Sequence, residues 1–204
     1  MGSLVMMPIV GFLTSKIDVR KLLATGFFVA GFTLIWLGQL NLQAGYWDIF
    51  WPQLLQGTGM ALTFVPLTTA TMQAIEPQRM GNAASLFNLM RNIGGSVGIA
   101  VTGTMLTRQR QTVATVLGEN INIYDPTTVT LLGQLKAGFM ARGADAVTAT
   151  ERSYAALHGM LLQQASMVSF VWLFRLLGGI FLMLLPLILI MRRPKGRVAP
   201  AAAH

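Results

Sequence analysis

The sequence predicts an all-α membrane protein, a partial helical bundle with about five transmembrane helices. Two observations carry this prediction. Long apolar stretches recur along the chain, and the segments between them hold nearly all of the charged residues. The composition agrees, because 53% of the residues are hydrophobic and only 11% are charged, whereas a soluble domain has roughly 25% charged residues.

The apolar stretches are the predicted membrane spans. A helix of roughly 20 apolar residues matches the roughly 30 Å thickness of the hydrocarbon layer, at a rise of about 1.5 Å per residue. By this measure the spans lie at about 1–15, 22–42, 49–75, 84–107 and 164–191. The first is short for a crossing and begins at Met1, so we favour a fragment of a longer protein over a marginal span.

This layout predicts four consecutive parts of the chain. They are the first four helices of the bundle at 1–107, with the first helix truncated; an extracytoplasmic loop with short helices at 108–163; the last transmembrane helix at 164–191; and a basic cytoplasmic tail at 192–204. Within the loop, residues 118–126 form a turn-rich break, and residues 127–142 and 148–163 have helical apolar spacing. These two helices form either a lid or a connector, and we favour the connector.

The positions of Lys and Arg predict the orientation. Basic residues concentrate in the cytoplasmic loops of membrane proteins. Here they lie in the loops at 16–21 and 76–83 and after residue 191, while the loop at 43–47 has none. We therefore expect a multi-pass protein of the cell inner membrane with a cytoplasmic C-terminus. The net charge of +8 gathers at the ends of the spans, which argues against a nucleic-acid partner.

Polar side chains inside the spans are candidates for function, because each costs free energy in lipid unless it faces protein or water. In the third span, Gln53, Gln56, Met60 and Thr63 follow steps of three and four residues and share one helix face. This face either lines a substrate cavity, with Met60 and Phe64 as adaptable apolar contacts, or makes interhelical hydrogen bonds. The sequence gives the two interpretations equal weight.

The fourth span adds Asn88 and Arg91 to the candidate cavity and contains Gly94, Gly95 and Gly98. Gly94 and Gly98 stand four residues apart, a spacing that lets two helix backbones approach closely. We therefore expect tight helix packing at these glycines. Arg91 lies about two turns from the predicted cytoplasmic end, so its side chain snorkels to the headgroups, makes a structural hydrogen bond, or faces the cavity as a functional cation.

Arg175 lies near the middle of the last span, among apolar neighbours. An Arg at the membrane centre costs at least about 2.5–3.5 kcal/mol, so it requires a partner, and the predicted spans contain no Asp or Glu to supply one. The partner lies in a missing part of the protein, or the side chain faces a wet cavity, or the span begins later and Arg175 is interfacial. Without an acid at membrane depth, we do not expect this chain alone to complete a proton cycle.

No constellation of residues indicates an enzyme. The chain has no Cys, and its only histidines are His158 and His204, so neither a thiolate site nor a His-rich metal site is expected. No phosphate-binding loop or nucleophile elbow occurs in the sequence. We predict no catalytic residue, no metal and no cofactor.

Three motifs follow one another along the chain. They are Gly11-Phe12-Leu13-Thr14-Ser15-Lys16-Ile17-Asp18-Val19-Arg20-Lys21 between the first two spans, Pro52 to Met60 with Phe64 to Thr71 in the third span, and Gly81 to Asn88 with Arg91 to Gly98 in the fourth. The first resembles the G-x-L-x-D-[RK] signature of the major facilitator superfamily. Together the motifs resemble, in order and spacing, the fourteen-helix drug:proton antiporter branch of EmrB/QacA type.

The resemblance implies a partial major facilitator bundle, with the five spans as helices ten to fourteen. It implies the C-terminal part of a multidrug efflux transporter that exchanges protons for amphipathic, often cationic, compounds by alternating access. It also implies a cytoplasmic gating loop in which Ser15 stands at the family's Asp position. The residues expected in this gate are Gly11, Lys16, Asp18, Arg20 and Lys21.

The partners that follow from the resemblance are the lipid bilayer, the N-terminal half of the same transporter, an amphipathic drug-like substrate and protons. In Gram-negative relatives a periplasmic adaptor and an outer-membrane channel are added. Two alternatives stay open at this point: a major facilitator carrier for another small molecule, and a truncated membrane bundle that binds a partner protein and does not transport.

Overall fold

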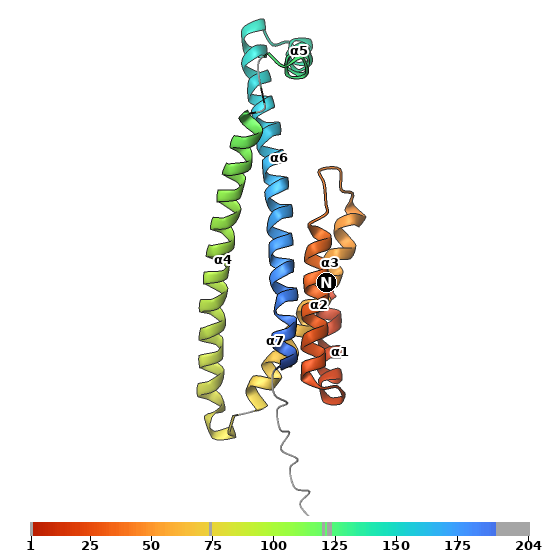
Figure 1. Cartoon of the computed structure of the whole chain (residues 1–204), viewed down its shortest axis with the longest axis vertical. Coiled ribbons are helices and arrows are strands. Elements are labelled where there is room, and N and C mark those ends of the chain that lie inside the picture. The colour runs from red at the N-terminus through yellow and green to blue at the C-terminus, as the bar shows by residue number, and fades with distance from the viewer. Residues whose placement is uncertain (1, 74, 120, 122–123, 191–204) are drawn as a thin grey trace, which may run out of the picture. The chain divides into compact units, whose positions relative to one another are not determined.

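The computed structural model describes residues 2–73, 75–119, 121 and 124–190, and its regular structure in these residues is helical (Figure 1). The basic tail predicted at 192–204 lies outside the described residues. The elements are α1 (Gly2–Lys16), α2 (Val19–Leu37), α3 (Tyr46–Gln73), the 3-10 turn η1 (Pro77–Arg79), α4 (Met80–Glu119), α5 (Pro126–Ala141), α6 (Ala146–Met183) and α7 (Leu185–Ile190). They divide into two compact units: residues 2–40, 44–97 and 174–190, and residues 41–43 and 98–173.

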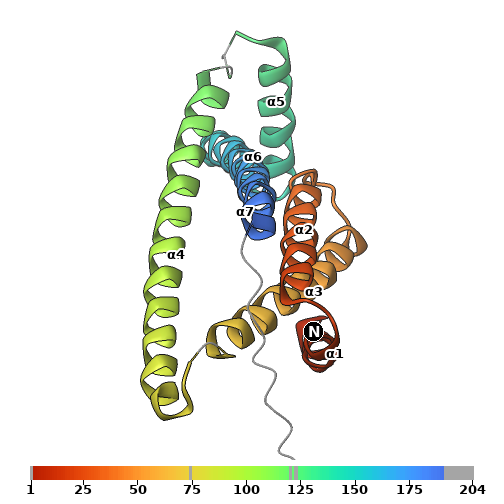
Figure 2. The same ribbon diagram turned by 60° about the horizontal axis from the view of Figure 1, so that its bottom comes forward.

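The core of the first unit lies where α1, α2 and α3 meet. Helix α3 packs against both α1 and α2, and α2 also contacts α7; Figures 1 and 2 show the first three helices side by side in both views. The centre of this contact is an apolar cluster of Val10, Leu22, Ala61 and Leu62, each at most 8% exposed. The three helices therefore form a small packed bundle that fixes the inward face of α3.

Glycines make these helix contacts close. A Cβ atom added to Gly59 of α3 would lie 2.9 Å from the backbone nitrogen of Ala30, and one added to Gly26 of α2 would lie 2.7 Å from the hydroxyl oxygen of Thr63. A Cβ on Gly178 of α6 would lie 2.9 Å from the backbone oxygen of Gly31. Small residues at such crossings let helices pack through van der Waals contact, which drives helix association where lipid surrounds the bundle.

The packing predicted at Gly94, Gly95 and Gly98 has no counterpart among the described residues. No atom of another element lies within 4 Å of a Cβ built at any of these three positions, and no residue of α4 is buried. Within the part of the chain described here, the close helix contacts are made by glycines of α2, α3 and α6 instead. A packing role for the three α4 glycines stays a prediction that needs a surface outside these residues.

Two helices are longer than the sequence predicts. The fourth span was expected to end near residue 107, but α4 continues to Glu119 and has 40 residues. The helix expected at 148–163 and the last span at 164–191 form one helix, α6, up to Met183. No proline interrupts either run, so the backbone stays helical where the side chains turn polar. At about 1.5 Å per residue, α4 is roughly 60 Å long, about twice the hydrocarbon thickness.

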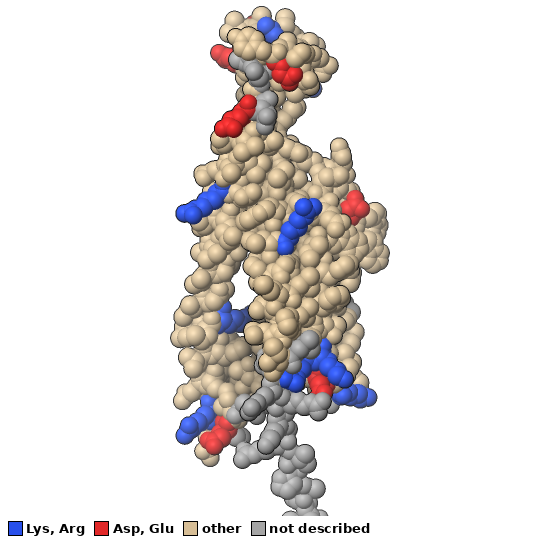
Figure 3. All heavy atoms as spheres, in the orientation of Figure 1, with Lys and Arg blue, Asp and Glu red and all other residues tan. Residues whose placement is uncertain are grey.

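Length and hydropathy single out fewer membrane helices than the five expected. In the described part of the chain, two helices are long and apolar enough to cross a membrane: Val19–Leu37, and the segment Ala146–Ile188 that joins α6 to α7. Helix α1 has only 15 residues, and polar residues lower the hydropathy of α3 and α4. On the face shown in Figure 3, most of the surface is uncharged, and several basic side chains and an acidic one gather near the lower end of the view.

In the second unit, aspartates start two helices. Asp125 caps α5 by accepting a hydrogen bond from the backbone N–H of Thr127 at 3.3 Å, and α5 begins where the predicted turn-rich break ends. Asp145 precedes α6 and accepts from the backbone N–H groups of Val147 and Thr148 at 3.2 and 3.3 Å. The hydrogen bonds from Thr148 are the largest cause that lowers the pKa of Asp145 below its ordinary value of 3.8. These caps satisfy backbone donors at exposed helix N-termini.

Candidate functional site

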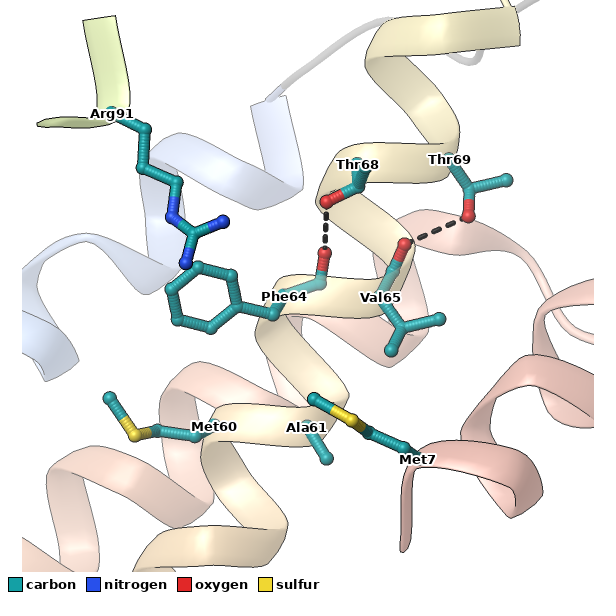
Figure 4. Close-up of a pocket in the computed structure, with 8 residues that line it drawn as sticks. All are labelled: Met7, Met60, Ala61, Phe64, Val65, Thr68, Thr69 and Arg91. Carbon is teal, nitrogen blue, oxygen red and sulfur yellow. Dashed lines mark hydrogen bonds between the residues drawn. The ribbon is translucent and has the colours of Figure 1, made fainter. Parts of the chain in front are cut away.

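The candidate site is an apolar pocket of about 520 Å³ in the first unit. This volume lies within the roughly 300–1,000 Å³ range of pockets that bind small molecules. Helix α3 supplies most of the wall, α1 supplies Met7, and the first half of α4 supplies Arg91 (Figure 4). The lining residues are Met7, Met60, Ala61, Phe64, Val65, Thr68, Thr69 and Arg91.

One cation faces this pocket. The Cζ atom of Arg91 lies 5.0 Å from the centroid of the Phe64 ring, and Figure 4 shows the guanidinium group extended over that ring. Such a cation–π contact is worth about 0.5–1 kcal/mol at an exposed site. Among the described residues, the only carboxylate paired with a base is Glu76, whose Oε2 lies 3.8 Å from Nε of Arg79. Arg91 is therefore held by an aromatic face and not by an acid.

The remaining wall is adaptable and offers few donors. The hydroxyl groups of Thr68 and Thr69 donate to the backbone oxygens of Phe64 and Val65, each at 2.8 Å. Their protons are thus used within α3, and the hydroxyl oxygens present only acceptor lone pairs to the pocket. Met7 and Met60 are about half exposed, and their flexible thioethers can adjust to ligands of different shape.

The structure places two of the predicted cavity residues in the pocket and four outside it. Met60 and Arg91 line it, but Gln53, Gln56, Thr63 and Asn88 do not. Thr63 lies instead at the contact between α2 and α3, beside Gly26, and its hydroxyl donates to the backbone oxygen of Gly59 at 2.9 Å. Gln53 and Asn88 are exposed.

Gln56 is half-buried, and its Oε1 is a buried atom without a hydrogen-bond partner in the described part of the chain. The predicted polar stripe lies on the helix face next to the one that lines the pocket. The lining face of α3 carries Met60, Phe64 and Thr68. Met7, Ala61, Val65, Thr68 and Thr69 were missed. The two threonines could have been found from the sequence, because they are polar residues inside a predicted span. Met7 could not, because one apolar residue in an apolar helix is not distinctive.

The predicted gating loop is a tight link between α1 and α2. Asp18 precedes α2, and its backbone oxygen accepts from the N–H groups of Lys21 and Leu22, while its side chain makes no capping bond. The Nζ of Lys16 lies 4.7 Å from the centroid of the Phe12 ring. The Nε of Arg20 is buried and has no hydrogen-bond partner among the described residues. No ion pair joins these side chains in the described part of the chain.

Gly11, the remaining predicted gate residue, lies within α1 and has no atom within 4 Å of a built Cβ. The side chain of Ser15 lies outside the described part of the structure. The buried Nε of Arg20 is the notable group, because an unpaired buried donor is costly and is normally satisfied.

Arg175 has a partner within the chain. Its Nε donates a hydrogen bond to the backbone oxygen of Gly38 at 2.8 Å, and Gly38 is the residue that ends α2. Carbonyl groups at a helix C-terminus lack partners in their own helix and carry partial negative charge. This hydrogen bond gives Arg175 one partner among the described residues, and a counter-charge in a missing part of the protein and a wet cavity both stay open as alternatives. The position of this bond at the end of α2, where the short loop to α3 begins, favours the interfacial interpretation.

No group of three or more His, Cys, Asp or Glu side chains in the described residues is placed to hold a metal ion. The site offers an apolar pocket with one cation, set in a helical bundle. This arrangement can bind an amphipathic small molecule. The fold and the site thus define an all-α membrane protein with a ligand-sized pocket among its helices.

Comparison with known proteins gives the family. The family described as Major Facilitator Superfamily matches residues 1–106, which is more than half of the chain, and the chain belongs to it. The described helices are accordingly a partial major facilitator bundle. No solved structure matches the chain.

Several curated relatives confirm the resemblance to the EmrB-type branch. The chain is 28% identical over 194 residues to the multidrug export protein EmrB of Escherichia coli strain K12, covering 94% of this chain and 36% of that protein. It is 35% identical over 129 residues to EmrB of Haemophilus influenzae, covering 63% and 25%. It is 33% identical over 120 residues to the fatty acid resistance protein FarB of Neisseria gonorrhoeae, covering 59% and 24%. The chain thus spans about a third of the length of its E. coli relative.

Proposed function

We propose that this chain is the C-terminal part of a proton-coupled multidrug efflux transporter that works by alternating access. The observation that carries the proposal is the pocket on α3, lined by Met60, Phe64 and Arg91, within a helical bundle that belongs to the major facilitator superfamily. Relatives named as multidrug export proteins support the efflux direction. Adaptable apolar walls suit a site that accepts several compounds of different shape.

Alternating access requires a second bundle that rocks against this one around the bound substrate. In this proposal the N-terminal half of the transporter supplies that bundle and also the proton-coupling acids. The loop formed by Lys16, Asp18, Arg20 and Lys21 contributes to the cytoplasmic gate. The Nε of Arg20 is buried and has no hydrogen-bond partner among the described residues, which supports this role. A partner on the other bundle would bind this donor in one state and release it in the other.

The proposed setting is the cell inner membrane, with the C-terminus in the cytoplasm and α5 on the opposite side. A periplasmic adaptor and an outer-membrane channel are proposed partners in a Gram-negative host. Reporter fusions after His204 and within 129–140 test the orientation. Signals from opposite compartments are expected, and signals from the same compartment would contradict it.

The function is tested by expressing the complete gene in an efflux-deficient strain and measuring the extrusion of several dyes. Collapse of the proton gradient should abolish extrusion. Phe64→Ala should lower extrusion of some dyes severalfold, because it removes the largest apolar side chain of the pocket wall. Phe28→Ala is the matched control, since Phe28 is an exposed aromatic residue of α2 outside the pocket. Gln56→Ala tests the predicted stripe: unchanged extrusion of all dyes would remove Gln56 from the cavity wall.

If the wild-type protein extrudes none of the dyes, or if extrusion persists without a proton gradient, the proposed function is wrong. A single transported metabolite in place of several dyes would favour the carrier for another small molecule.

A further inference from the structure

We propose that Arg175 forms a binding site for the phosphate group of a membrane phospholipid, at the end of the first unit where α2 ends. The Nε of Arg175 donates to the backbone oxygen of Gly38 at 2.8 Å, and Arg175 is an exposed residue. The proposal goes beyond transport, because it concerns the lipid that surrounds the bundle. It does not depend on what the pocket on α3 binds.

Arg175 is held in place but keeps most of its donors. A guanidinium group has five N–H donors and no acceptor, and the bond to Gly38 uses one of them. Within the described part of the chain, the only ion pair joins Arg79 to Glu76, so no described carboxylate neutralises Arg175. A fixed guanidinium with unused N–H groups suits a phosphate, whose oxygens it can bind through two parallel hydrogen bonds.

The crossing of α2 and α6 fixes the position of Arg175. A Cβ atom built on Gly178 would lie 2.9 Å from the backbone oxygen of Gly31, and the rings of Phe27 and Phe181 have centroids 5.3 Å apart. Gly178 follows Arg175 by three residues on α6, so the Arg stands about one helical turn from this close contact. A packed pair of helices, and not a loop, therefore presents the guanidinium group.

The level of Arg175 in the membrane follows from the length of α2. This helix has 19 residues, so it is roughly 28 Å long, close to the roughly 30 Å thickness of the hydrocarbon layer. Its first end adjoins the basic link with Lys16, Arg20 and Lys21, and its other end is Gly38. When the basic link lies at one headgroup layer, Gly38 and the guanidinium bonded to it lie near the other layer, where the lipid phosphates are.

Aromatic residues mark the same level. Tyr46, Trp47 and Trp51 are exposed residues at the start of α3, where the short loop from Gly38 ends. The ring centroids of Tyr46 and Trp47 are 5.5 Å apart, and those of Trp47 and Trp51 are 6.5 Å apart. Trp and Tyr concentrate at membrane–water interfaces, because each has an apolar body and a polar tip. This cluster supports a headgroup layer at the Gly38 end of the helices.

A row of exposed aromatic side chains on α2 offers a surface to the acyl chains. Phe28, Phe32 and Trp36 follow steps of four residues and are all exposed. The ring centroids are 6.4 Å apart for the first pair and 6.2 Å for the second. Trp36 precedes Gly38 by two residues, so the row ends near the residue that binds Arg175. A phospholipid has both parts that this surface can bind, an anionic group and apolar chains.

The phosphate chemistry has two sources, a membrane lipid and a soluble anion, and we commit to the lipid. The level of Arg175 and the adjoining aromatic row favour it, because a soluble anion uses neither. The soluble anion is one outcome of the test below.

The test is chemical modification of arginine in the full-length transporter, purified and delipidated in a neutral detergent. Phenylglyoxal reacts with the terminal nitrogens of accessible guanidinium groups, and peptide mass spectrometry reports the modified fraction at each Arg. Arg175 should be modified in the lipid-free protein, and dioleoylphosphatidylglycerol should slow its modification severalfold. Dioleoylglycerol, which has the same chains without the phosphate, should not protect Arg175. Neither lipid should protect Arg79, which pairs with Glu76.

A second measurement uses variants, with native mass spectrometry to determine the affinity for dioleoylphosphatidylglycerol. Arg175→Gln should weaken binding by on the order of tenfold or more, the factor expected for loss of a charge-assisted hydrogen bond. Arg175→Lys keeps the charge without the planar fork, so its affinity should lie between the two. Arg79→Gln is the matched control and should not change the affinity. The modification assay uses the wild-type protein, so the proposal stays testable if Arg175→Gln does not fold.

Each of the following results would overturn the proposal. Equal protection by glycerophosphoglycerol, which has the phosphate but no acyl chains, would mean a site for soluble anions. If Arg175 is not modified in the lipid-free protein, another part of the transporter covers it. Equal lipid affinity in the wild-type protein and in folded Arg175→Gln would mean that Arg175 only joins α6 to α2. Dye extrusion is not measured in either assay, so the proposed function and this proposal can fail independently.

Discussion

Replacing Gly59 with alanine places one methyl group at a close contact between α2 and α3. A Cβ built on Gly59 lies 2.9 Å from the backbone nitrogen of Ala30 and 3.2 Å from both its Cα and its Cβ atoms. Two of these three atoms belong to the backbone of α2. The methyl group cannot be accommodated by rotating a side chain, so the two helices must separate or shift along each other.

The magnitude follows from two opposing effects. Overpacking a well-packed contact costs typically 1–3 kcal/mol, and alanine is about 1 kcal/mol better than glycine inside a helix. The net loss of stability for Gly59→Ala should therefore be about 1 kcal/mol. Gly94→Ala is the matched variant, because Gly94 is also inside a helix but has no atom within 4 Å of a built Cβ. It gains the same helix preference without the steric cost, so the two variants should differ by about 1–3 kcal/mol.

The assay is unfolding of the detergent-purified protein, followed by helical circular dichroism during titration with a denaturing detergent. Gly94→Ala should be as stable as the wild-type protein or more stable, and Gly59→Ala should be less stable than both. If Gly59→Ala unfolds at the same point as Gly94→Ala, or later, the close approach of α2 and α3 does not determine stability and the reasoning fails. If Gly94→Ala is the less stable variant, a surface outside the described residues packs on α4, as the sequence predicted.

Three further predictions follow from single side chains. Arg175→Leu should cost about 1 kcal/mol through loss of its hydrogen bond to Gly38, while Arg108→Leu, at an exposed Arg of α4, should cost less; equal losses measured by the same unfolding assay would refute the bond's role. Gln56→Leu should be neutral or stabilising, since its Oε1 is buried without a partner in the described chain, and a clear loss of stability would mean that a partner exists. Asp145→Asn should lower the stability of α6 at neutral pH. Because the pKa of Asp145 is lowered, the difference in stability between wild type and variant should be present above pH 3.8 and should disappear as the pH falls through the lower pKa of the folded state. A difference that persists in acid would contradict this.

The fold class was predictable because it depends on hydrophobicity and charge averaged over many residues. Long apolar runs, a scarcity of charge and the order of three motifs all survive an error of several residues in any boundary. The helix ends were less predictable because a span is defined by its side chains and a helix by its backbone. Helix α4 passes from apolar to polar residues near Arg108 and stays helical to Glu119, since neither environment prevents its hydrogen bonds. A proline or a capped turn ends a helix, whereas a change in polarity does not.

The site was only partly predictable, for a geometric reason. A shift of one residue along a helix moves to a neighbouring face. The polar stripe that includes Gln53 and Gln56 therefore adjoins the face that lines the pocket, and Met60 belongs to both. Which face is inward is decided by packing against α1 and α2, and α2 approaches α3 closely at Gly26 and Gly59. Those glycines carry no chemical group that marks them in the sequence, and the contact that each one makes appears only when both helices are placed.

The arginines show which part of an inference about membrane residues is secure. The cost of a charge in lipid predicts that Arg175 has a partner, and Arg175 donates to a helix-terminal carbonyl. The identity of the partner does not follow from that cost, because this carbonyl serves where an acid was sought, while Arg91 contacts an aromatic face. Arg175 donates its Nε proton to the backbone oxygen of Gly38 and so connects two helices. Arg91 contacts the Phe64 ring and lines a pocket. The same residue type thus makes an interhelical hydrogen bond at one position and lines a pocket at the other.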